Sequence, residues 1–285
     1  MKLRAPFVQL PVLFDADRLA AEVASLGPDA WRPHPQGYEG NDFLPLISAH
    51  GDPQSEAFGG PMRPTPYLSS SDRPYLQEVL ASLGAVLGRT RLMRLSGHAE
   101  VVEHADANYY WRDRMRVHIP IITQPTVSFH CGDAMVNMGP GECWIFDTWR
   151  LHKVINDAER SRIHLVADTV GGEGFWELAR RGRASDAPAP ANWTAQKIEP
   201  SGAKHVLEFE SVNVPIVMSP GPGPTIVRGV AWNSVGDIRV LSSLHGLCSG
   251  SPESGGESRC LFGGSGRAYV GGSFPLKPPM QALAE

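Results

Sequence analysis

The sequence predicts a mainly β fold with flanking helices, arranged as a double-sheet, cupin-like jelly roll. From residue 90 onward, short runs rich in β-branched and aromatic residues alternate with a period of two. Turn residues such as Ser-Gly, Gly-Pro-Gly and Asn-Asp separate these runs. Helix-like segments stand before this region rather than inside it. Short, regularly spaced strands with turns between them are typical of sandwiches and barrel-like folds, including the jelly roll.

The chain begins with a strand and a helix. Residues 8–15 alternate well enough to predict a strand. Residues 15–27 then follow a helical pattern, with Asp15 or Asp17 as the N-cap and Gly27 at the end.

A second helix is expected before the strand-rich region. Residues 31–66 are rich in Pro, Gly and Asn, which predicts loops with short strands. Residues 69–88 have a helical pattern, with Ser71 or Asp72 as the N-cap and Pro74 in the first turn. We expect both helices to pack on one outer face of the jelly roll.

The strands of the jelly roll follow in order. The period of two predicts them at 91–96, 99–106, 114–122, 127–132, 143–149 and 162–170, with a further element beginning at His152. Gly139 and Gly141 allow a tight turn before the strand at 143–149.

The C-terminal part of the chain loses this pattern. We expect a domain over 1–180, a Pro- and Ala-rich linker over 181–200, and an irregular or partly disordered segment over 201–285. The last of these is rich in Gly, Ser and Pro and has no clear hydrophobic period, a composition poorly suited to a packed core.

Composition and charge exclude several classes of function. The 285 residues carry a net charge of −4, so no basic surface for nucleic acid or for membranes is expected. Four cysteines without CxxC spacing do not form a disulfide framework, and we expect Cys131 and Cys143 to be small buried residues. No signal peptide or membrane span is apparent. These features predict a cytoplasmic protein whose oligomeric state stays open.

Three side chains have the chemistry of a metal site. His104 and Asp106 are two residues apart, so a strand places both on one face. His152 lies on a later element that a jelly roll brings close to them. Two imidazoles and one carboxylate form the facial triad of non-haem Fe(II) proteins. A single histidine in a strand is more often a satisfied polar residue than a ligand, so the prediction depends on the complete set with Arg162 after it.

The motifs in this region resemble a known family. They are His-Ala-Asp at 104–106, Arg-Met-Arg-Val-His-Ile-Pro at 114–120, Gly-Glu-Cys-Trp-Ile-Phe-Asp at 141–147, His-Lys-Val at 152–154 and Arg-Ile-His-Leu-Val-Ala-Asp at 162–168. They resemble the aspartyl/asparaginyl β-hydroxylase family, which includes bacterial proline hydroxylases. The resemblance is strong over residues 91–171 and does not reach the C-terminal hundred residues.

The resemblance implies a double-stranded β-helix and an Fe(II)- and 2-oxoglutarate-dependent dioxygenase that uses O2. In that family pattern His104, Asp106 and His152 would hold iron. Arg162 would bind the distal carboxylate of 2-oxoglutarate, for which a planar guanidinium is well suited.

Further residues fall in supporting positions of the family pattern. Arg116 and His118 match positions that help to bind the co-substrate. His164 shares the parity of Arg162, and is as well explained by a buried histidine bonded to backbone as by a place in the same cavity. Asp147 resembles a fixed residue of the family near the metal-binding turn, and it is expected to bond backbone amides or to orient His152 and not to be a fourth ligand.

Substrate contacts are expected on loops at the mouth of the fold. The loop that starts at Asn108 carries three consecutive aromatic residues, which either cover a substrate or cap the core. The candidate substrate-binding residues are Tyr109, Tyr110, Trp111, Arg112 and Arg150.

The predicted function is hydroxylation of an amino acid, free or in a peptide, coupled to decarboxylation of 2-oxoglutarate. One alternative is a non-catalytic, metal-binding jelly-roll module with a regulatory or ligand-binding role. Another is a cupin-like enzyme that uses the triad with a different metal for hydrolysis or isomerisation. The sequence does not identify the substrate.

Overall fold

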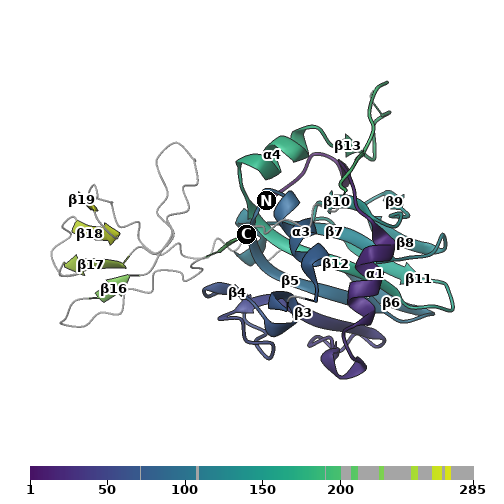
Figure 1. The fold of residues 1–285 in the computed structure, drawn as a ribbon. Coiled ribbons are helices and arrows are strands. Elements are labelled where there is room, and N and C mark those ends of the chain that lie inside the picture. The colour runs from purple at the N-terminus through teal and green to yellow at the C-terminus, as the bar shows by residue number, and fades with distance from the viewer. Residues whose placement is uncertain are drawn as a thin grey trace, which may run out of the picture. The chain divides into compact units, whose positions relative to one another are not determined.

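A computed structural model shows how the chain is arranged (Figure 1). It describes residues 1–70, 72–106, 109–189, 191–199 and 207–210, and the backbone of four strands between residues 225 and 270. The chain divides into two compact units, Met1–Glu210 and Ser211–Glu285. Each unit is treated by itself below.

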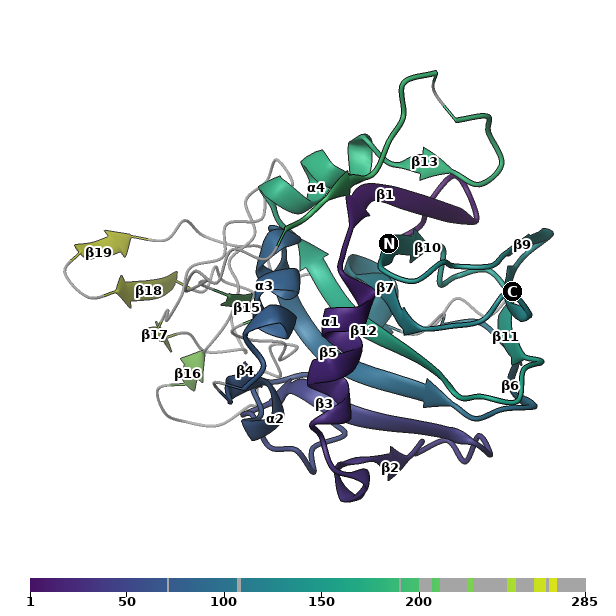
Figure 2. The same cartoon turned by 45° about the vertical axis from the view of Figure 1, so that its right-hand side comes forward.

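Two β-sheets form the body of the first unit (Figures 1 and 2). The large sheet has the strand order β13-β1-β10-β7-β12-β5-β3-β2, and the small sheet has the order β6-β11-β8-β9. The long strands of the large sheet are β1 (Phe7–Leu13), β3 (Asn41–Ala49), β5 (Val86–Leu95), β7 (Met115–Ile122), β10 (Glu142–Phe146) and β12 (Arg162–Gly171). The small sheet consists of β6 (Ala99–His104), β8 (Val127–Cys131), β9 (Ala134–Val136) and β11 (His152–Asn156). The short strands β2 (Arg32–Pro33) and β4 (Met62–Pro64) pair with β3.

The order of these strands confirms the predicted jelly roll. From β5 to β12 the chain crosses repeatedly between the two sheets, with β5, β7, β10 and β12 in the large sheet and β6, β8, β9 and β11 in the small one. All pairings among these eight strands are antiparallel. This arrangement is a double-stranded β-helix. All six strand runs predicted after residue 90 are present, with ends that differ by a few residues.

Because side chains alternate along these strands, one face packs into the hydrophobic core and the other face is directed to the space between the sheets. On β12, Ile163, Leu165 and Ala167 join the main hydrophobic cluster under the helices. The alternate residues Arg162, His164, Val166 and Asp168 are buried as well, and of these Arg162 and Val166 line the cavity between the sheets. The polar side of this strand therefore faces an internal cavity instead of solvent.

The helices cover the outer face of the large sheet (Figure 2). Helix α1 (Ala16–Ala24) begins as predicted, because the Asp15 side chain accepts a hydrogen bond from the Arg18 amide. Its buried residues Leu19 and Val23 join the same cluster as β12. Of the three short helices, η1 (Pro28–Ala30) lies between α1 and β2, α2 (Pro66–Ser69) follows β4, and η2 (Tyr109–Asp113) connects β6 and β7. Helix α4 (Glu173–Arg180) follows β12.

The second predicted helix is shorter than expected and is capped differently. Helix α3 spans Pro74–Ser82, and the chain from Val86 onward is already β5. Asp72 is not its cap; the N-cap position is Arg73, which makes no side-chain capping bond. Instead, the carboxylate of Glu22 on α1 accepts the amides of Tyr75 and Leu76 at 2.8 Å each. A tertiary contact thus supplies the cap, which a local pattern does not show. Ser71 lies outside the described residues.

The large sheet continues beyond residue 180. Three two-residue strands, β13 (Arg183–Ala184), β14 (Gln196–Lys197) and β15 (Glu208–Phe209), pair with β1, β1 and β5. Parts of the segment expected to be a linker are therefore attached to the sheet. The predicted domain boundaries themselves stay a prediction.

The described part of the second unit is a four-stranded antiparallel sheet. Its strands, in the order β16-β17-β18-β19, are β16 (Thr225–Val227), β17 (His245–Ser249), β18 (Arg259–Gly264) and β19 (Arg267–Val270). The composition of this segment does not predict these strands. The expectation of irregular or disordered structure for the rest of 201–285 falls mostly outside the described residues. Among the residues that the structure describes, no helix is long and apolar enough to cross a membrane.

Candidate metal centre

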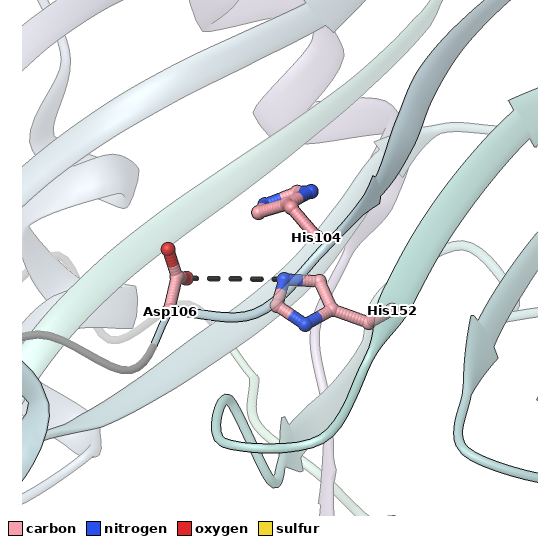
Figure 3. A group of neighbouring side chains, drawn as sticks. All are labelled: His104, Asp106 and His152. Atoms are coloured by element: carbon pink, nitrogen blue, oxygen red, sulfur yellow. Dashed lines mark ion pairs between the residues drawn. The ribbon is translucent and has the colours of Figure 1, made fainter.

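The three candidate ligands meet at one end of the small sheet (Figure 3). His104 is the last residue of β6, and His152 is the first residue of β11. The two strands pair antiparallel with His104 opposite His152, and the ring centroids lie 4.3 Å apart. Asp106 follows β6, and its backbone amide donates to the Thr148 carbonyl. One ligand atom from each of the three residues lies within 4.8 Å of the others.

Hydrogen bonds orient both imidazole rings. The Nδ1 atom of His104 lies 2.8 Å from the Val102 carbonyl, and that of His152 lies 2.9 Å from the Arg150 carbonyl. Because a carbonyl only accepts, each Nδ1 must carry the proton, and each Nε2 keeps a free lone pair. Burial lowers the pKa of His152 to about 4, although the Arg150 carbonyl and Asp106 oppose that shift. Its ring is therefore neutral at neutral pH, as a metal ligand must be.

The turn before His152 is held in place by Asp147. This buried carboxylate accepts the Trp149 amide at 3.1 Å and the Arg150 guanidinium at 3.2 Å. The same turn presents the Arg150 carbonyl that orients His152. Asp147 thus acts on the ligand through the backbone.

The donor set fits a ferrous ion. Two imidazole nitrogens and one carboxylate oxygen converge from one side, the pattern of the facial triad, which leaves further positions open. Within the described part of the chain, this is the one group of three or more His, Cys, Asp or Glu side chains with metal-binding spacing.

The metal position opens into a cavity of about 270 Å³ between the sheets. The large sheet contributes one polar wall, with Arg89, Arg91, Arg116, His118 and Arg162. The small sheet contributes the apolar residues Val101, Phe129 and Val154, and β10 of the large sheet adds Phe146. Two loops complete the lining, one with His34, Pro35, Gln36 and Tyr38, and one with Glu56 and Phe58.

Arg162 is a buried cation without a carboxylate partner among the described residues. Its side chain is 3% exposed, and its Nε has no hydrogen-bond partner. Burial lowers its pKa to about 10, so it stays protonated at neutral pH. An unpaired buried charge is costly, which indicates that an anion in the cavity compensates it.

Arg116 is engaged with the protein itself. It donates to Asp106 at 2.9 Å and to Asp168 at 3.0 Å, and it lies 4.2 Å above the ring of Trp111. Burial would lower the pKa of Arg116, but the two carboxylates outweigh it and raise the pKa above its usual value. Arg116 therefore fixes a candidate metal ligand, and its predicted part in co-substrate binding stays a prediction.

His118 and His164 form a buried pair next to Arg162. Their Nδ1 atoms lie 3.4 Å apart, and each Nε2 has no hydrogen-bond partner among the described residues. Burial, followed by the charge of Arg162, holds the pKa of both rings well below the usual value. Both are neutral, so neither adds positive charge to this end of the cavity.

The five candidate substrate residues do not line the described part of the cavity. Tyr109 is 73% exposed, and Arg112 is exposed as well. Tyr110 and Trp111 are buried; Tyr110 donates to Asp168, and Trp111 packs under Arg116. Arg150 is bound to Asp147 and to the Arg4 carbonyl. The aromatic pair thus supports the arginine wall, the substrate role of all five stays a prediction, and Asn108 lies outside the described residues.

Sequence reasoning missed the loops at residues 34–38 and 56–58 and two arginines of β5. The loops carry no pattern that relates them to the cavity. Arg89 and Arg91, however, share one strand face, as Arg116 and His118 do. The same parity argument applied to β5 would have found them.

Comparison with known proteins gives one family match and several similar proteins. Residues 69–171 match the family model described as aspartyl/asparaginyl β-hydroxylase. Two curated relatives, L-proline cis-3-hydroxylases 1 and 2 from Streptomyces sp, are each 28% identical over 143 and 175 residues. These alignments cover 47% and 54% of this chain and 48% and 58% of the relatives, so the chain spans about half the length of the curated relatives it matches. A prolyl-4-hydroxylase structure from Pseudomonas putida has a TM-score of 0.41 at 16% identity, covering 58% of this chain and 92% of that one.

A double-stranded β-helix with two histidines and an aspartate at one end defines the class of mononuclear, non-haem metal proteins. Residues 69–171 match the model of the aspartyl/asparaginyl β-hydroxylase family, the family that the motifs of this segment resemble. That segment contains the three candidate ligands and Arg162.

Proposed function

We propose that this protein is an Fe(II)- and 2-oxoglutarate-dependent hydroxylase of an amino acid, free or in a peptide. One observation carries the proposal: an oriented His-Asp-His set shares a cavity with the unpaired, buried Arg162. A metal with open positions beside an anchored anion is the arrangement that a 2-oxo acid co-substrate needs. The two curated relatives are both named as proline hydroxylases, which is the same chemistry.

In this proposal His104, Asp106 and His152 hold the iron. The bound ion supplies the oxygen chemistry, in which substrate C–H, 2-oxoglutarate and O2 yield hydroxylated substrate, succinate and CO2. The Val102 and Arg150 carbonyls keep both Nε2 atoms directed at the metal. Arg116 fixes the carboxylate of Asp106 through one oxygen.

The rest of the cavity positions the co-substrate and limits water. Arg162 would bind the distal carboxylate of 2-oxoglutarate, because its guanidinium has no carboxylate of the protein to pair with in the described residues. Phe129 and Phe146 form apolar walls beside His152, with ring centroids 6.3 and 4.9 Å from its ring. Such walls exclude water from the reacting atoms.

The proposal is tested by succinate formation. The protein is incubated with Fe(II), 2-oxoglutarate and a panel of free amino acids and peptides, and we expect succinate and hydroxylated product in equal amounts. The His152→Ala variant should form neither. The control is His130→Ala on the neighbouring strand β8, whose ring contacts Ser128 and does not line the cavity. Turnover retained by His152→Ala would sink the assignment.

A further inference from the structure

A second arginine of the cavity is buried without a carboxylate partner. Arg91 on β5 is 6% exposed, and its Nε has no hydrogen-bond partner in the described residues. Burial lowers its pKa to about 9, and the charges of Arg89 and Arg116 contribute to that shift. Asp168 opposes that shift, so Arg91 still carries its charge at neutral pH, yet it forms no ion pair with a carboxylate among the described residues.

Arg91 and Arg162 stand at separate places in the cavity. Arg91 on β5 lies opposite Val166 on β12, while Arg162 lies opposite Leu95. Four residues separate each pair along its strand, which corresponds to roughly 13 Å at about 3.3 Å per residue. A co-substrate carboxylate bound to Arg162 therefore leaves Arg91 available for a different anion.

The carboxylates near Arg91 are already engaged. Asp168 accepts Arg116 at 3.0 Å and Tyr110 at 3.1 Å, and it lies 3.6 Å from Arg89. Asp106 accepts Arg116.

Glu56, which lines the cavity as Asp106 does, pairs with Arg32 at 3.0 Å. His34 also lines the cavity, and it is neutral because burial lowers its pKa to about 4. The wall at Arg91 is thus left with excess positive charge.

We propose that Arg91 binds a free carboxylate of the substrate, so that the substrate is a free amino acid or a similar small acid. This inference rests on the proposed function, and it selects free acids over residues inside a peptide. The size of the cavity agrees, since about 270 Å³ lies below the roughly 300–1,000 Å³ of pockets for larger ligands. Met93 and Val166, which line the cavity near Arg91, offer apolar contacts to the carbon skeleton.

The test compares acids with amides. L-proline, L-leucine, L-aspartate and L-asparagine are assayed beside their α-amides and beside an N-acetylated, C-amidated peptide that contains aspartate. For the wild type we expect turnover of at least one free acid and an apparent KM at least about tenfold higher for its amide. Arg91→Gln should raise the KM for the acid roughly 10- to 150-fold, the loss of one charge-assisted contact, and bring acid and amide close together.

Two controls keep this result specific. Arg94→Gln changes an arginine of the same strand that pairs with Asp42 and does not line the cavity, and it should leave both KM values unchanged. Arg91→Gln should also leave the KM for 2-oxoglutarate unchanged. Its melting temperature should not fall, because the change removes an unpaired buried charge.

The outcomes separate this inference from the proposed function. If Arg91→Gln still prefers the acid over the amide as strongly as the wild type does, the inference is overturned. It is also overturned if the wild type turns over the amidated peptide and Arg91→Gln does not. A raised KM for 2-oxoglutarate in Arg91→Gln overturns it as well, since Arg91 would then serve the co-substrate. If the wild type forms no succinate and calorimetry detects no binding of 2-oxoglutarate, the proposed function fails. Arg91 is then judged by binding of the same acids and amides to the metal-free protein.

Discussion

The two imidazoles of the candidate metal centre owe their orientation to backbone carbonyls two residues before each ring. His104 donates to Val102 and His152 donates to Arg150, so both rings present the same nitrogen. Arg116 holds the third ligand, Asp106, and is itself held by Asp168. Each ligand is thus fixed before any metal binds, which reduces the entropy lost on binding.

At this scale Arg162 makes the clearest prediction for the co-substrate. Arg162→Gln should raise the apparent KM for 2-oxoglutarate roughly 10- to 150-fold, because it removes a charge-assisted contact worth about 1.5–3 kcal/mol. Steady-state kinetics with varied 2-oxoglutarate checks this. Arg94→Gln is the matched control, and an unchanged KM in Arg162→Gln would assign the anchor to another residue.

Strand β12 shows how one element serves two interiors. Its odd-numbered residues Ile163 and Leu165 pack under the helices. Of its even-numbered residues, Arg162 lines the cavity and Asp168 accepts a hydrogen bond from Arg116. Burial alone would raise the pKa of Asp168, but Arg116, Arg89 and Arg91 outweigh it and hold the pKa below its usual value. The ionised carboxylate is therefore part of the folded structure.

The depressed pKa of Asp168 predicts a pH-dependent contribution to stability. This contribution is fully present above the unfolded pKa of about 4 and is lost as the pH falls through the lower folded value. Asp168→Asn should reduce the free energy of unfolding by about 3–5 kcal/mol at pH 7, because Arg116 loses a buried partner. Urea denaturation at pH 7 and at several values below pH 5 should show this difference shrinking. The exposed Asp133→Asn is the control, and a difference independent of pH would contradict the assignment.

The turn before β10 depends on a glycine at one position. Gly141 has a φ of +78°, and an added Cβ would meet the backbone oxygen of Phe14. Its amide and carbonyl also bond Pro120 and Phe14, so the backbone has no freedom to adjust. The turn at Gly141 therefore positions the start of β10 between β1 and β7.

Gly141→Ala is accordingly expected to destabilise the protein by about 1–3 kcal/mol. Gly27→Ala, at a position with nothing within 4 Å of an added Cβ, should change stability far less. Thermal or chemical unfolding of both variants decides the matter. Equal effects would mean that the Gly141 turn tolerates a side chain.

On the scale of the whole molecule, the first unit closes on itself near its C-terminal end. Glu210 accepts Arg114 through both oxygens, at 3.1 and 2.7 Å, and both side chains are buried. Burial raises the pKa of Glu210 to about 7, and the Arg114 guanidinium opposes that rise. Two close contacts to a guanidinium are the geometry of an ionised pair, and we take Glu210 to be charged at neutral pH. The hydrophobic clusters of the described residues all lie before this point.

A chain that ends at Glu210 is therefore expected to fold. Its melting temperature should match the transition of the first unit in the full chain within a few degrees. A chain that ends at residue 206 loses Glu210 and leaves Arg114 buried and unpaired, at a cost of about 3–5 kcal/mol or roughly 6–20 °C. Glu210→Gln in the full chain should behave like the shorter chain, and Glu208→Gln, an exposed site on β15, should not. Equal stability of both truncated chains would mean that the ion pair of Glu210 with Arg114 does not stabilise the first unit.

Local patterns determined much of this protein in advance. The period of two predicted the strands of the jelly roll, the spacing of His104, Asp106 and His152 predicted the metal set, and the motifs around them predicted the family. These features can be predicted from short stretches of sequence, because strand parity and family motifs depend on residues that are close together in the chain. Parity also predicted that Arg116 and His118 share one strand face, and both line the cavity.

Only the tertiary structure decided which polar groups meet. It brought Glu22 to the start of α3, joined Arg116 to Asp106 and Asp168, and buried Tyr110 and Trp111 behind the arginine wall. It also left Arg91 and Arg162 without carboxylate partners among the described residues. Partners separated by tens of residues leave no periodic trace in a sequence, so pairing and its absence become visible only when the strands are placed side by side. The sequence therefore determined the fold and the candidate metal ligands, whereas the packing of the sheets decided which buried charges stay without a carboxylate partner.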